Sequence, residues 1–374
     1  MVVEIFDIYN PLNKKKLQIL DLEGQVINSE LEPKISNDKL LKMYKTMVLA
    51  RVADIKAVQF QRQGRMLSYV VNEGHEGGQI GIASALEEKD WISPYFRDMG
   101  LYLYRGIPLE NVYLYWYGNE KGSKLDPKKR ILPVNIIIGS GINIGAGLAV
   151  SSKLQNKDEV TLATIGDGGT AHEEFYAGLN FASVYKAPFV VAIQNNQYAI
   201  STPRKTASNS ETLAQKCYAF GIPGIQVDGN DVLAVHVAVK EFVERSRQKK
   251  GPGLIEIVTY RMGPHTTNDN TTLYRSKAEE EEWRQKDPIV RFQKYLLNKN
   301  ILTQEIISEI DKDAEEHVVQ THERILTYGN EVEPIEVFEH TYNEMTPQLK
   351  EQYSEYESFF KKFKERKLIK NEFK

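Results

Sequence analysis

Short, largely apolar runs alternate with longer helical segments through the middle of the chain, and this pattern constrains the fold more than any other feature. The runs are VTLATI (160–165), FVVAIQ (189–194), IQV (225–227) and LIEIV (254–258). Strands that are apolar on both faces occur in parallel sheets that helices cover on both sides. The sequence therefore predicts an α/β fold whose ligand site lies beyond the carboxyl ends of the strands.

Helical segments flank this region and divide the chain of 374 residues into three predicted parts. Ser36-Asn37-Asp38 is typical of a helix N-cap, and Gly64 is a stop signal after a long segment with apolar residues at helical spacing. A second helix is predicted over Gly77 to Leu86. We expect an N-terminal arm at 1–35, an α/β domain at 36–290 and a charged, helical C-terminal segment at 291–374.

The composition excludes several classes of protein. A net charge of -3, with acidic and basic residues mixed along the chain, provides no basic surface for nucleic acid. The single cysteine, Cys217, excludes an internal disulfide and a Cys-based metal cluster, and we expect it to fill the core. The first twenty residues resemble neither a signal peptide nor a transit peptide, so a cytoplasmic location is expected.

An uncharged stretch of 22 residues, Ile131 to Ser152, is long enough for a membrane span. It also contains Pro133, Asn135, Asn143 and four glycines, which interrupt a spanning helix. We therefore expect a buried strand, a loop and the start of a helix in this stretch, and no membrane span.

Polar residues follow two of the predicted strands at the point where each strand ends. VTLATI is followed by Gly166-Asp167-Gly168-Gly169, and FVVAIQ is followed by Asn195-Asn196. Carboxylate and amide oxygens are hard ligands suited to Mg²⁺, and glycines allow backbone amides to approach a phosphate closely. A helix predicted to begin near Glu173 directs its N-terminus to the same region. The motifs predict a site for Mg²⁺ and a phosphate group; the alternative is a tight turn and a polar strand end.

The GDG and NN motifs are separated by 26 residues, and this arrangement resembles the cofactor motif of thiamine-diphosphate enzymes. The resemblance extends along almost the whole chain, through QFQRQGRM, ISPYFRDMG, IIIGSGINIGAG, GDGGTAHEEFYAGLNFA, VVAIQNNQYAISTP, LAQKCYAFGIPGIQVDGND, GPGLIEIVTYRMGPHTTND and LYRSKAEEEEWRQKDPI. These segments are similar to the alpha subunit of the thiamine-dependent first component of 2-oxo acid dehydrogenase complexes. GDGGT, GPHTT and LKEQYSEY are most similar to bacterial members that act on pyruvate, whereas QRQGRM and EGG resemble branched-chain members.

The resemblance implies a thiamine-diphosphate-binding fold with Mg²⁺ bound on the diphosphate. By position in the motif, Asp167, Asn196 and the backbone carbonyl of Tyr198 would be the metal ligands. The same motif places Gly168 and Gly169 beside the cofactor.

Other positions would contact the rest of the cofactor. Phe96 and Arg97 stand where the family has a Tyr-Arg pair. Arg97 would pair with the diphosphate through its planar guanidinium, whereas Phe96 lacks the hydroxyl. Backbone groups of Ile136 and Ile138 would hold the aminopyrimidine, and Ile138 would wedge the cofactor into a bent conformation. Gln194 would hydrogen-bond a phosphate.

The segment GPHTTNDNTTLYR resembles the mobile loop over the active-site entrance in this family. His265 matches a histidine that stabilises the diphosphate side and the reacting carbonyl. Asp269, Tyr274 and Arg275 match loop residues that order the lid and guide the lipoyl arm. The alternative is a surface loop rich in Asn and Thr. The resemblance gives no role to His75.

The resemblance implies an enzyme that decarboxylates a 2-oxo acid, with pyruvate favoured, and passes the acyl group to the lipoyl domain of an acyltransferase core. In two-chain members of the family, the glutamate bonded to the aminopyrimidine belongs to the beta subunit. This chain is therefore expected to form half of each catalytic centre in an α2β2 assembly. Two alternatives stay open: a nicotinamide dehydrogenase, because GSGINIG partly matches a dinucleotide fingerprint, and a non-catalytic scaffold subunit.

Overall fold

The computed structural model describes residues 5–328, 335–339 and 341–365 of the chain. By the density of internal contacts the chain divides into two compact units, residues 1–321 and 322–374. Residues 1–4 of the predicted arm and 366–374 of the predicted C-terminal segment lie outside the described residues. The three-part division expected from the sequence stays a prediction.

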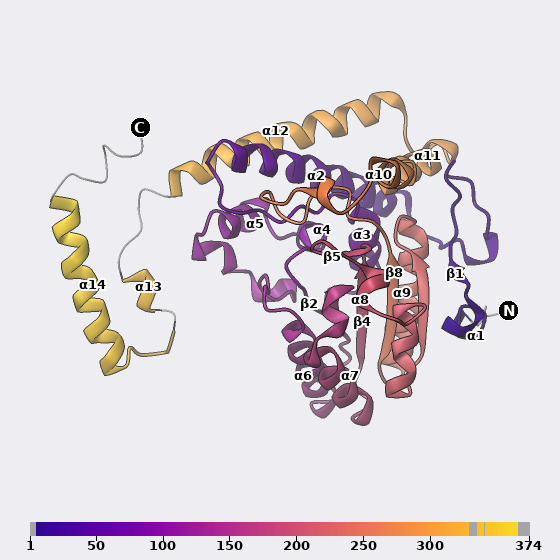
Figure 1. The fold of residues 1–374 in the computed structure, drawn as a ribbon, viewed down its shortest axis with the longest axis horizontal. Helices are drawn as coiled ribbons and strands as arrows, with labels where there is room; N and C mark the ends of the chain where they lie inside the picture. Colours follow the sequence, from indigo (N-terminus) through magenta and orange to yellow (C-terminus); the bar gives the residue numbers. More distant parts are fainter. Residues whose placement is uncertain (1–4, 329–334, 340, 366–374) are drawn as a thin grey trace. The chain divides into compact units, whose positions relative to one another are not determined.

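A six-stranded parallel sheet forms the centre of the first unit (Figure 1). Its spatial order is β1-β7-β8-β4-β3-β2, and every neighbouring pair is parallel. The strands are β1 (Lys16–Leu17), β2 (Trp91–Ser93), β3 (Thr161–Gly166), β4 (Phe189–Asn195), β7 (Gly224–Asp228) and β8 (Gly253–Val258). The α/β fold class is confirmed, and so are the four strands expected from the apolar runs.

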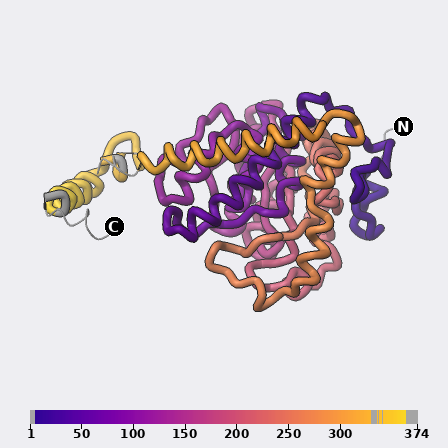
Figure 2. The backbone as a smooth tube through the Cα atoms, turned by 90° about the horizontal axis from the view of Figure 1, so that it is seen from above, coloured from indigo at the N-terminus to yellow at the C-terminus, as the bar shows by residue number. Residues whose placement is uncertain are grey.

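The apolar runs predict neither of the two outer strands, because these strands are very short. β1 lies in the segment predicted as an N-terminal arm and pairs with β7 through two residues. The carboxylate of Asp231 holds the arm there, since its Oδ2 accepts the backbone N–H groups of Ile19 and Leu20 at 2.7 and 2.6 Å. The ring of Phe6 also lies 4.9 Å from the ring of Phe242, and Figure 2 shows the arm along this edge of the unit.

Helices cover both faces of the sheet. On one face lie α6 (Ser140–Leu154) and α7 (Glu173–Val184), and on the other lie α3 (Glu76–Ala85) and α9 (Val232–Arg247). Side chains of a strand alternate between the faces. One face of β3 and β4 therefore shares a core cluster with α6 and α7, which includes Ala146, Ile165, Phe175, Leu179, Phe189, Val191, Ile193 and Cys217. The core position expected for Cys217 is confirmed.

The first unit contains several further helices. They are α1 (Ile5–Ile8), α2 (Asn37–Arg62), α4 (Met99–Tyr104), α5 (Leu109–Trp116), α8 (Arg204–Ala207), α10 (Lys277–Arg284) and α11 (Pro288–Asn298). The helices predicted after Ser36 and over 77–86 are α2 and α3, and the Ser36 hydroxyl oxygen caps α2 at the backbone N–H of Lys39. The uncharged stretch 131–152 forms a loop and most of α6. The buried strand expected there is wrong, because Ile131 makes only an isolated bridge with Ile92, and Ile136 and Ile137 are exposed. None of the helices that the structure describes could span a membrane.

The second unit is helical, as expected for the C-terminal segment. Its elements are the end of α12 (Gln304–Tyr328), α13 (Glu336–Glu339) and α14 (Pro347–Glu365). The ring of Phe338 in α13 contacts the rings of Tyr353 and Tyr356 in α14, at centroid distances of 5.7 and 5.8 Å.

A small antiparallel pair, β5 (Tyr198–Ala199) and β6 (Thr202–Pro203), completes the first unit directly after β4.

Candidate active site

A cavity of about 480 Å³ lies beyond the carboxyl ends of β3 and β4. Its wall comes from segments that are far apart in the sequence, mainly 94–97, 135–139, 164–169, 198–200 and 265–266. Most of the residues predicted for the site line it, namely Phe96, Arg97, Ile136, Ile138, Asp167, Gly168, Gly169, Asn196, Tyr198 and His265. The fold therefore brings together motifs that the sequence keeps apart, whereas Gln194, Tyr274 and Arg275 lie outside this wall.

Asp167 follows β3 directly and is buried, with only 5% of its surface exposed. Its oxygen Oδ2 has no hydrogen-bond partner within the described part of the chain. Burial raises the pKa of Asp167 to about 6, although backbone hydrogen bonds from Asp167 and Asn196 and the charges of Arg261 and Arg97 act to lower it. A buried carboxylate oxygen without a partner indicates a place where a cation or a donor binds.

The glycines after Asp167 were expected to let backbone amides approach a phosphate. They also have a packing role. A Cβ atom on Gly168 would lie 2.5 Å from the Cβ of Ala199, and one on Gly169 would lie 2.5 Å from Cγ1 of Ile165. Real Cβ contacts under 3.0 Å are essentially unknown. The loop therefore packs too closely on β3 and β5 to carry side chains at these positions, and its backbone stays in the cavity wall.

The two adjacent asparagines at the end of β4 make different contacts. Asn195 Nδ2 donates to Glu256 Oε1 of β8 at 2.6 Å. Asn196 lines the cavity, with Nδ2 3.0 Å from His75 Nε2 and Oδ1 accepting the backbone N–H of Tyr198 at 3.3 Å. Asn195 thus braces the turn against the neighbouring strand, whereas Asn196 belongs to the cavity.

The backbone carbonyl of Tyr198, the third predicted metal ligand, already has one partner. It accepts a hydrogen bond from Arg261 Nη1 at 3.3 Å. Arg261 is fully buried, and its Nη2 donates to the carbonyl of Ile200 at 2.7 Å and to the hydroxyl of Tyr274 at 2.8 Å. Because a carbonyl oxygen has two lone pairs, the Tyr198 carbonyl has capacity for one more partner.

Arg97 is buried in the cavity wall, and protein groups hold its guanidinium. Nη1 donates to the backbone carbonyl of Val71, and Nη2 donates to the backbone carbonyl of His265 at 3.1 Å. Burial lowers the pKa of Arg97 to about 10, so the group is still charged at neutral pH. The neighbouring Phe96 ring lies 6.1 Å from the His265 ring. This wall therefore combines one fixed positive charge with aromatic surface.

His265 faces two guanidinium groups. Its Nδ1 lies 3.1 Å from Arg97 Nη2 and 3.3 Å from Arg261 Nη1. Since guanidinium nitrogens only donate, Nδ1 accepts and the proton of the neutral ring is on Nε2. Burial, together with the charges of Arg97 and Arg261, lowers the pKa of His265 to about 3. At physiological pH the ring is neutral and offers an N–H donor.

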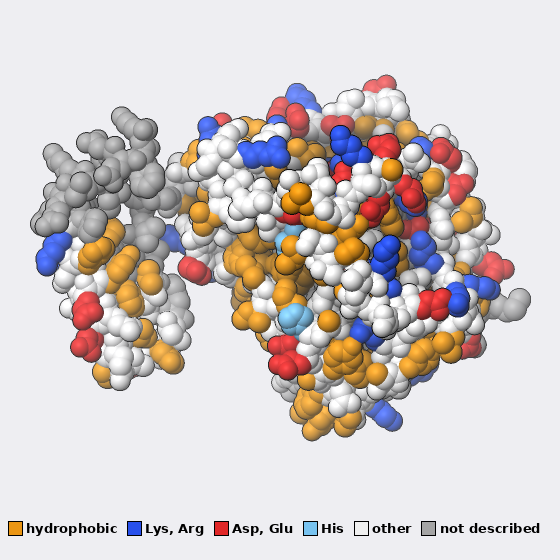
Figure 3. Space-filling model, viewed as in Figure 1, with side chains coloured by type: hydrophobic (Ala, Val, Ile, Leu, Met, Phe, Trp, Pro, Cys, Tyr) orange, Lys and Arg blue, Asp and Glu red, His pale blue; other side chains and the backbone are white. Residues whose placement is uncertain are grey.

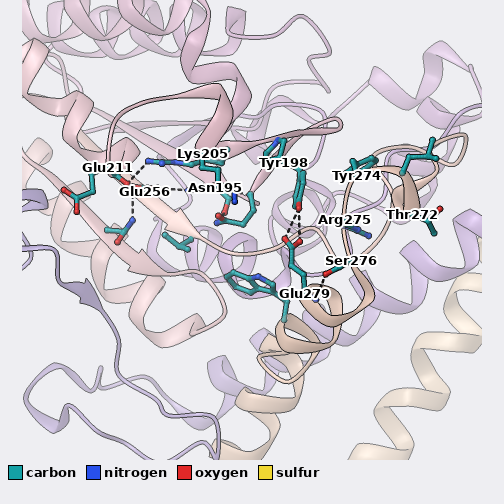
Figure 4. Close-up of a pocket in the computed structure, with 17 residues that line it drawn as sticks. Asn195, Tyr198, Lys205, Glu211, Glu256, Thr272, Tyr274, Arg275, Ser276 and Glu279 are labelled. Atoms are coloured by element: carbon teal, nitrogen blue, oxygen red, sulfur yellow. Dashed lines mark hydrogen bonds between the residues drawn. The ribbon is translucent and has the colours of Figure 1, made fainter.

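A second cavity, of about 800 Å³, shares Tyr198 with the first (Figure 4). In Figure 4 the Tyr198 hydroxyl points to Glu279 and donates to its carboxylate oxygens at 2.9 Å. Tyr274 and Arg275, both predicted to order the lid over the active site, line this larger cavity and not the smaller one.

The loop residues predicted to order the lid form hydrogen bonds within their own segment of the chain. Asp269 Oδ2 accepts the backbone N–H of His265 at 2.7 Å and the hydroxyl of Tyr274 at 2.5 Å. The guanidinium of Arg275 donates to three successive backbone carbonyls, those of residues 261–263. These contacts fix the segment that carries His265, whereas guidance of a lipoyl arm stays a prediction.

Gln194 is buried and does not line the cavity. Its Nε2 donates to Asp98 Oδ1 at 2.6 Å, and Asp98 Oδ2 accepts the backbone N–H of Tyr95 at 3.0 Å. Burial raises the pKa of Asp98 to about 7, against hydrogen bonds from Thr164 and Gln194. In this structure Gln194 ties β4 to the segment that carries Phe96 and Arg97.

Three residues of the site have no motif that identifies them. Tyr95 lines the cavity, and its buried hydroxyl has no partner within the described chain; its place directly before Phe96 is the only signal. Arg261 reaches the cavity residues from the segment that follows β8. His75 contacts Asn196 across 121 positions of sequence, and no spacing rule predicts such a contact.

A parallel sheet with a cavity at its carboxyl edge, lined by Asp167 and Asn196 from neighbouring strands, defines an α/β protein with a ligand site at the position typical of such sheets. The chain belongs to the dehydrogenase E1 component family, whose sequence model matches residues 44–330. It is 58% identical to the pyruvate dehydrogenase E1 component subunit alpha of Acholeplasma laidlawii, over 91% of this chain and 99% of the relative. The identity is 40% for the protein of that name in Mycoplasma genitalium (95% and 99% covered) and 42% for that in Staphylococcus aureus (82% and 84%).

This membership confirms the family expected from the motifs and implies the use of thiamine diphosphate. It also shows that the nicotinamide alternative is wrong. GSGINIG opens helix α6 after a loop at 132–139, whereas a dinucleotide fingerprint follows a strand directly.

Proposed function

We propose that this chain is the alpha subunit of the first component of a pyruvate dehydrogenase complex. With a beta subunit it would decarboxylate pyruvate, using thiamine diphosphate and Mg²⁺, and transfer the acetyl group to the lipoyl group of an acyltransferase. The observation that carries the proposal is the buried, unpartnered Oδ2 of Asp167 beside Asn196 in a cavity at the sheet edge. Pyruvate is the proposed substrate because the similar bacterial proteins carry its name.

The residues of the cavity fit a magnesium ion bound on a diphosphate. Asp167, the amide oxygen of Asn196 and the carbonyl of Tyr198 would be its protein ligands, and all three are hard oxygens. Among the described residues no group of three His, Cys, Asp or Glu side chains could hold a metal. The diphosphate and water would therefore complete the octahedral shell. A bound cation would also favour the ionised form of the buried carboxylate.

Other residues of this chain would bind the anionic and ring parts of the cofactor. Arg97 lines the cavity and Arg261 lies behind its wall, and the two guanidinium groups would put positive charge close to the diphosphate. The Nε2–H of His265 would donate to the diphosphate side or to the carbonyl oxygen of the substrate as charge develops on it. Backbone groups of Ile136 and Ile138 would hold the aminopyrimidine. When bound, thiamine diphosphate supplies the carbanion that makes decarboxylation of a 2-oxo acid possible.

The cavity lacks one group that the chemistry of this family needs. None of the described residues that line it is a glutamate, and the family requires a glutamate bonded to the aminopyrimidine. We propose that the beta subunit contributes it, in an α2β2 assembly. Exposed apolar side chains over α6 and α7 (Figure 3) fit such a contact, and they include Ile144, Leu154, Phe181, Val184 and Tyr185.

The test is reconstitution of this chain with the beta subunit of the same complex. We expect decarboxylation that requires thiamine diphosphate and Mg²⁺, with a higher kcat/KM for pyruvate than for 3-methyl-2-oxobutanoate. The chain alone should be inactive, and activity of the lone chain would contradict the shared catalytic centre. Preference for the branched acid would reassign the substrate, and an assembly that binds cofactor without turnover would favour a scaffold role.

A further inference from the structure

We propose that His75 is a positioning residue of the metal site, because its Nε2 fixes the amide of Asn196 in the orientation that makes the amide oxygen the ligand. The inference rests on the proposed function, since it concerns the Mg²⁺ and diphosphate assigned to this cavity. His75 does not line the cavity itself. Its contact with Asn196 comes from a different part of the chain, directly before helix α3.

The two ring nitrogens of His75 face different kinds of partner, and these partners define the tautomer. Nδ1 lies 3.1 Å from the backbone carbonyl oxygen of Asn72. A carbonyl oxygen can only accept, so Nδ1 carries the proton and Nε2 of the neutral ring is an acceptor. The ring is fully buried.

Two independent contacts then select the same orientation of the Asn196 amide. Nδ2 donates to Nε2 of His75 at 3.0 Å, and Oδ1 accepts the backbone N–H of Tyr198 at 3.3 Å. A flipped amide would place its oxygen against the lone pair of Nε2 and its hydrogens against the N–H of Tyr198. Both hydrogen bonds would be lost, and buried polar groups that lose their partners raise the free energy of the folded state.

The segment that carries His75 is held firmly. The carboxylate of Asp54 accepts the backbone N–H groups of Asn72 and Glu73 at 2.7 and 3.0 Å, and the hydroxyl of Tyr69 at 2.7 Å. These bonds fix the peptide whose carbonyl sets the tautomer of His75. The imidazole therefore meets Asn196 as a fixed acceptor and not as a mobile side chain.

The orientation matters because the two ends of an amide affect a cation in opposite ways. The oxygen attracts Mg²⁺, whereas the NH₂ group repels it. Without an acceptor at Nε2, the amide of Asn196 would populate the orientation that does not bind. Loss of a residue that orients a metal ligand typically lowers metal affinity by about 10- to 100-fold.

Two substitutions separate the roles of the two ring nitrogens. His75→Asn can keep a donor near the position of Nδ1, toward the Asn72 carbonyl, but does not reach Asn196. His75→Gln can place an acceptor oxygen near the position of Nε2 and restore the contact with Asn196. Should His75→Asn not fold, His75→Leu removes the acceptor at a similar side-chain volume and takes its place. His236→Asn is the matched control, because His236 is also buried, contacts Ser84 at 2.8 Å and lines neither cavity.

The measurement is calorimetric titration of Mg²⁺ into the reconstituted α/β assembly at saturating thiamine diphosphate, with ligand-free melting temperatures as the fold control. We expect His75→Asn to raise the apparent Kd for Mg²⁺ by about 10-fold or more. His75→Gln and His236→Asn should stay close to wild type in Mg²⁺ affinity.

Equal affinity in wild type and His75→Asn would overturn the positioning role and leave the proposed function intact. The same holds if His75→Gln loses as much affinity as His75→Asn, or if His236→Asn loses it too. Failure of the wild-type assembly to bind Mg²⁺ and thiamine diphosphate would instead overturn the proposed function.

Discussion

The two cavities that share Tyr198 differ in how their polar groups are satisfied. In the larger cavity, the carboxylates of Glu256 and Glu279 accept hydrogen bonds from protein donors. Of its described lining residues only Arg204 has a buried side-chain atom, Nε, without a partner, and the same guanidinium donates to two backbone carbonyls. The larger cavity is therefore a polar space whose groups bind one another.

The smaller cavity shows the opposite pattern. The hydroxyl of Tyr95 and Oδ2 of Asp167 are both buried in its wall without a partner in the described chain. Burial of a polar group without a hydrogen bond costs free energy, so a fold keeps such groups mainly where something else binds. Unsatisfied polar atoms, and not volume, thus distinguish the site.

The largest effect should come from the carboxylate of Asp167. Asp167→Ala removes a desolvated, partly unpartnered group, so the ligand-free melting temperature should change little. The affinity for Mg²⁺ and thiamine diphosphate should fall by more than about 100-fold, because the only charged side chain among the proposed metal ligands is lost. Calorimetric titration and melting curves on the same sample measure both quantities.

Asp167→Asn is the matched control, since it keeps the shape and removes the charge; it should lose Mg²⁺ binding as well. Cofactor affinity equal to wild type in either variant would show that this carboxylate is not a ligand. A large drop in melting temperature would show that the group is already satisfied by the fold, and the contrast between the cavities would fail.

Glu256 in the larger cavity should behave in the opposite way. Its oxygens accept Asn195 Nδ2 at 2.6 Å, the backbone N–H of Ala214 at 2.9 Å and Gln226 Nε2 at 3.2 Å. Glu256→Ala leaves these donors without their acceptor and should lower the free energy of unfolding by about 3 kcal/mol. Urea unfolding of the ligand-free protein measures the loss.

Glu256→Gln keeps one acceptor oxygen and should lose less stability than Glu256→Ala. If Glu256→Ala unfolds at the same urea concentration as wild type, the groups of the larger cavity are not held by their mutual bonds. The size of a cavity would then be as good a guide to the site as the satisfaction of its polar atoms.

The buried carboxylate of Asp167 should also give the ligand-free protein a pH dependence. Burial raises the pKa of Asp167 from 3.8 to about 6, so between these values the folded state keeps a proton that the unfolded state has released. The stability due to protonated Asp167 is fully present below pH 3.8 and is lost as the pH rises through about 6, by up to about 1.4 kcal/mol per pH unit.

Unfolding free energies of wild type and Asp167→Asn, measured across this window, isolate the effect. The value for wild type minus that for the variant should fall by about 1–3 kcal/mol from low to high pH. Saturating Mg²⁺ and thiamine diphosphate should remove the slope for wild type, since metal binding favours the ionised form. A flat difference without ligand would mean that the carboxylate is not desolvated.

The part of the site that lies on neighbouring strands could be predicted from the sequence. Apolar strands are a local signal, and adjacent parallel strands end at the same edge, which places Asp167 beside Asn196. The glycines of the motif were also informative, although close packing on Ala199 and Ile165 explains them as well as a phosphate does.

Contacts between distant segments could not be predicted in this way. The hydrogen bond from Gln194 to Asp98 is one example. Gln194 lies on β4, and its partner there depends on which segment packs against that face of the strand. The strand pattern does not reveal this segment. The contact of His75 with Asn196 likewise depends on how the segment before α3 folds over the end of β4.

The smallest effect is expected at Tyr198, whose two polar groups serve different cavities. Its hydroxyl donates to Glu279 in the larger cavity, whereas its backbone carbonyl is the proposed metal ligand in the smaller one. Tyr198→Phe removes the hydroxyl and keeps the carbonyl. It should lower the free energy of unfolding by about 1 kcal/mol and leave the apparent Kd for Mg²⁺ unchanged.

Glu279→Gln and the double variant complete a cycle that measures the coupling between the hydroxyl and the carboxylate. Urea unfolding should show that the two substitutions together cost less than the sum of the single ones, because both remove the same interaction. If Tyr198→Phe weakens Mg²⁺ binding as strongly as Asp167→Asn does, the two sides of Tyr198 do not act separately. The larger cavity would then belong to the cofactor site, and its satisfied polar groups would be part of the catalytic apparatus.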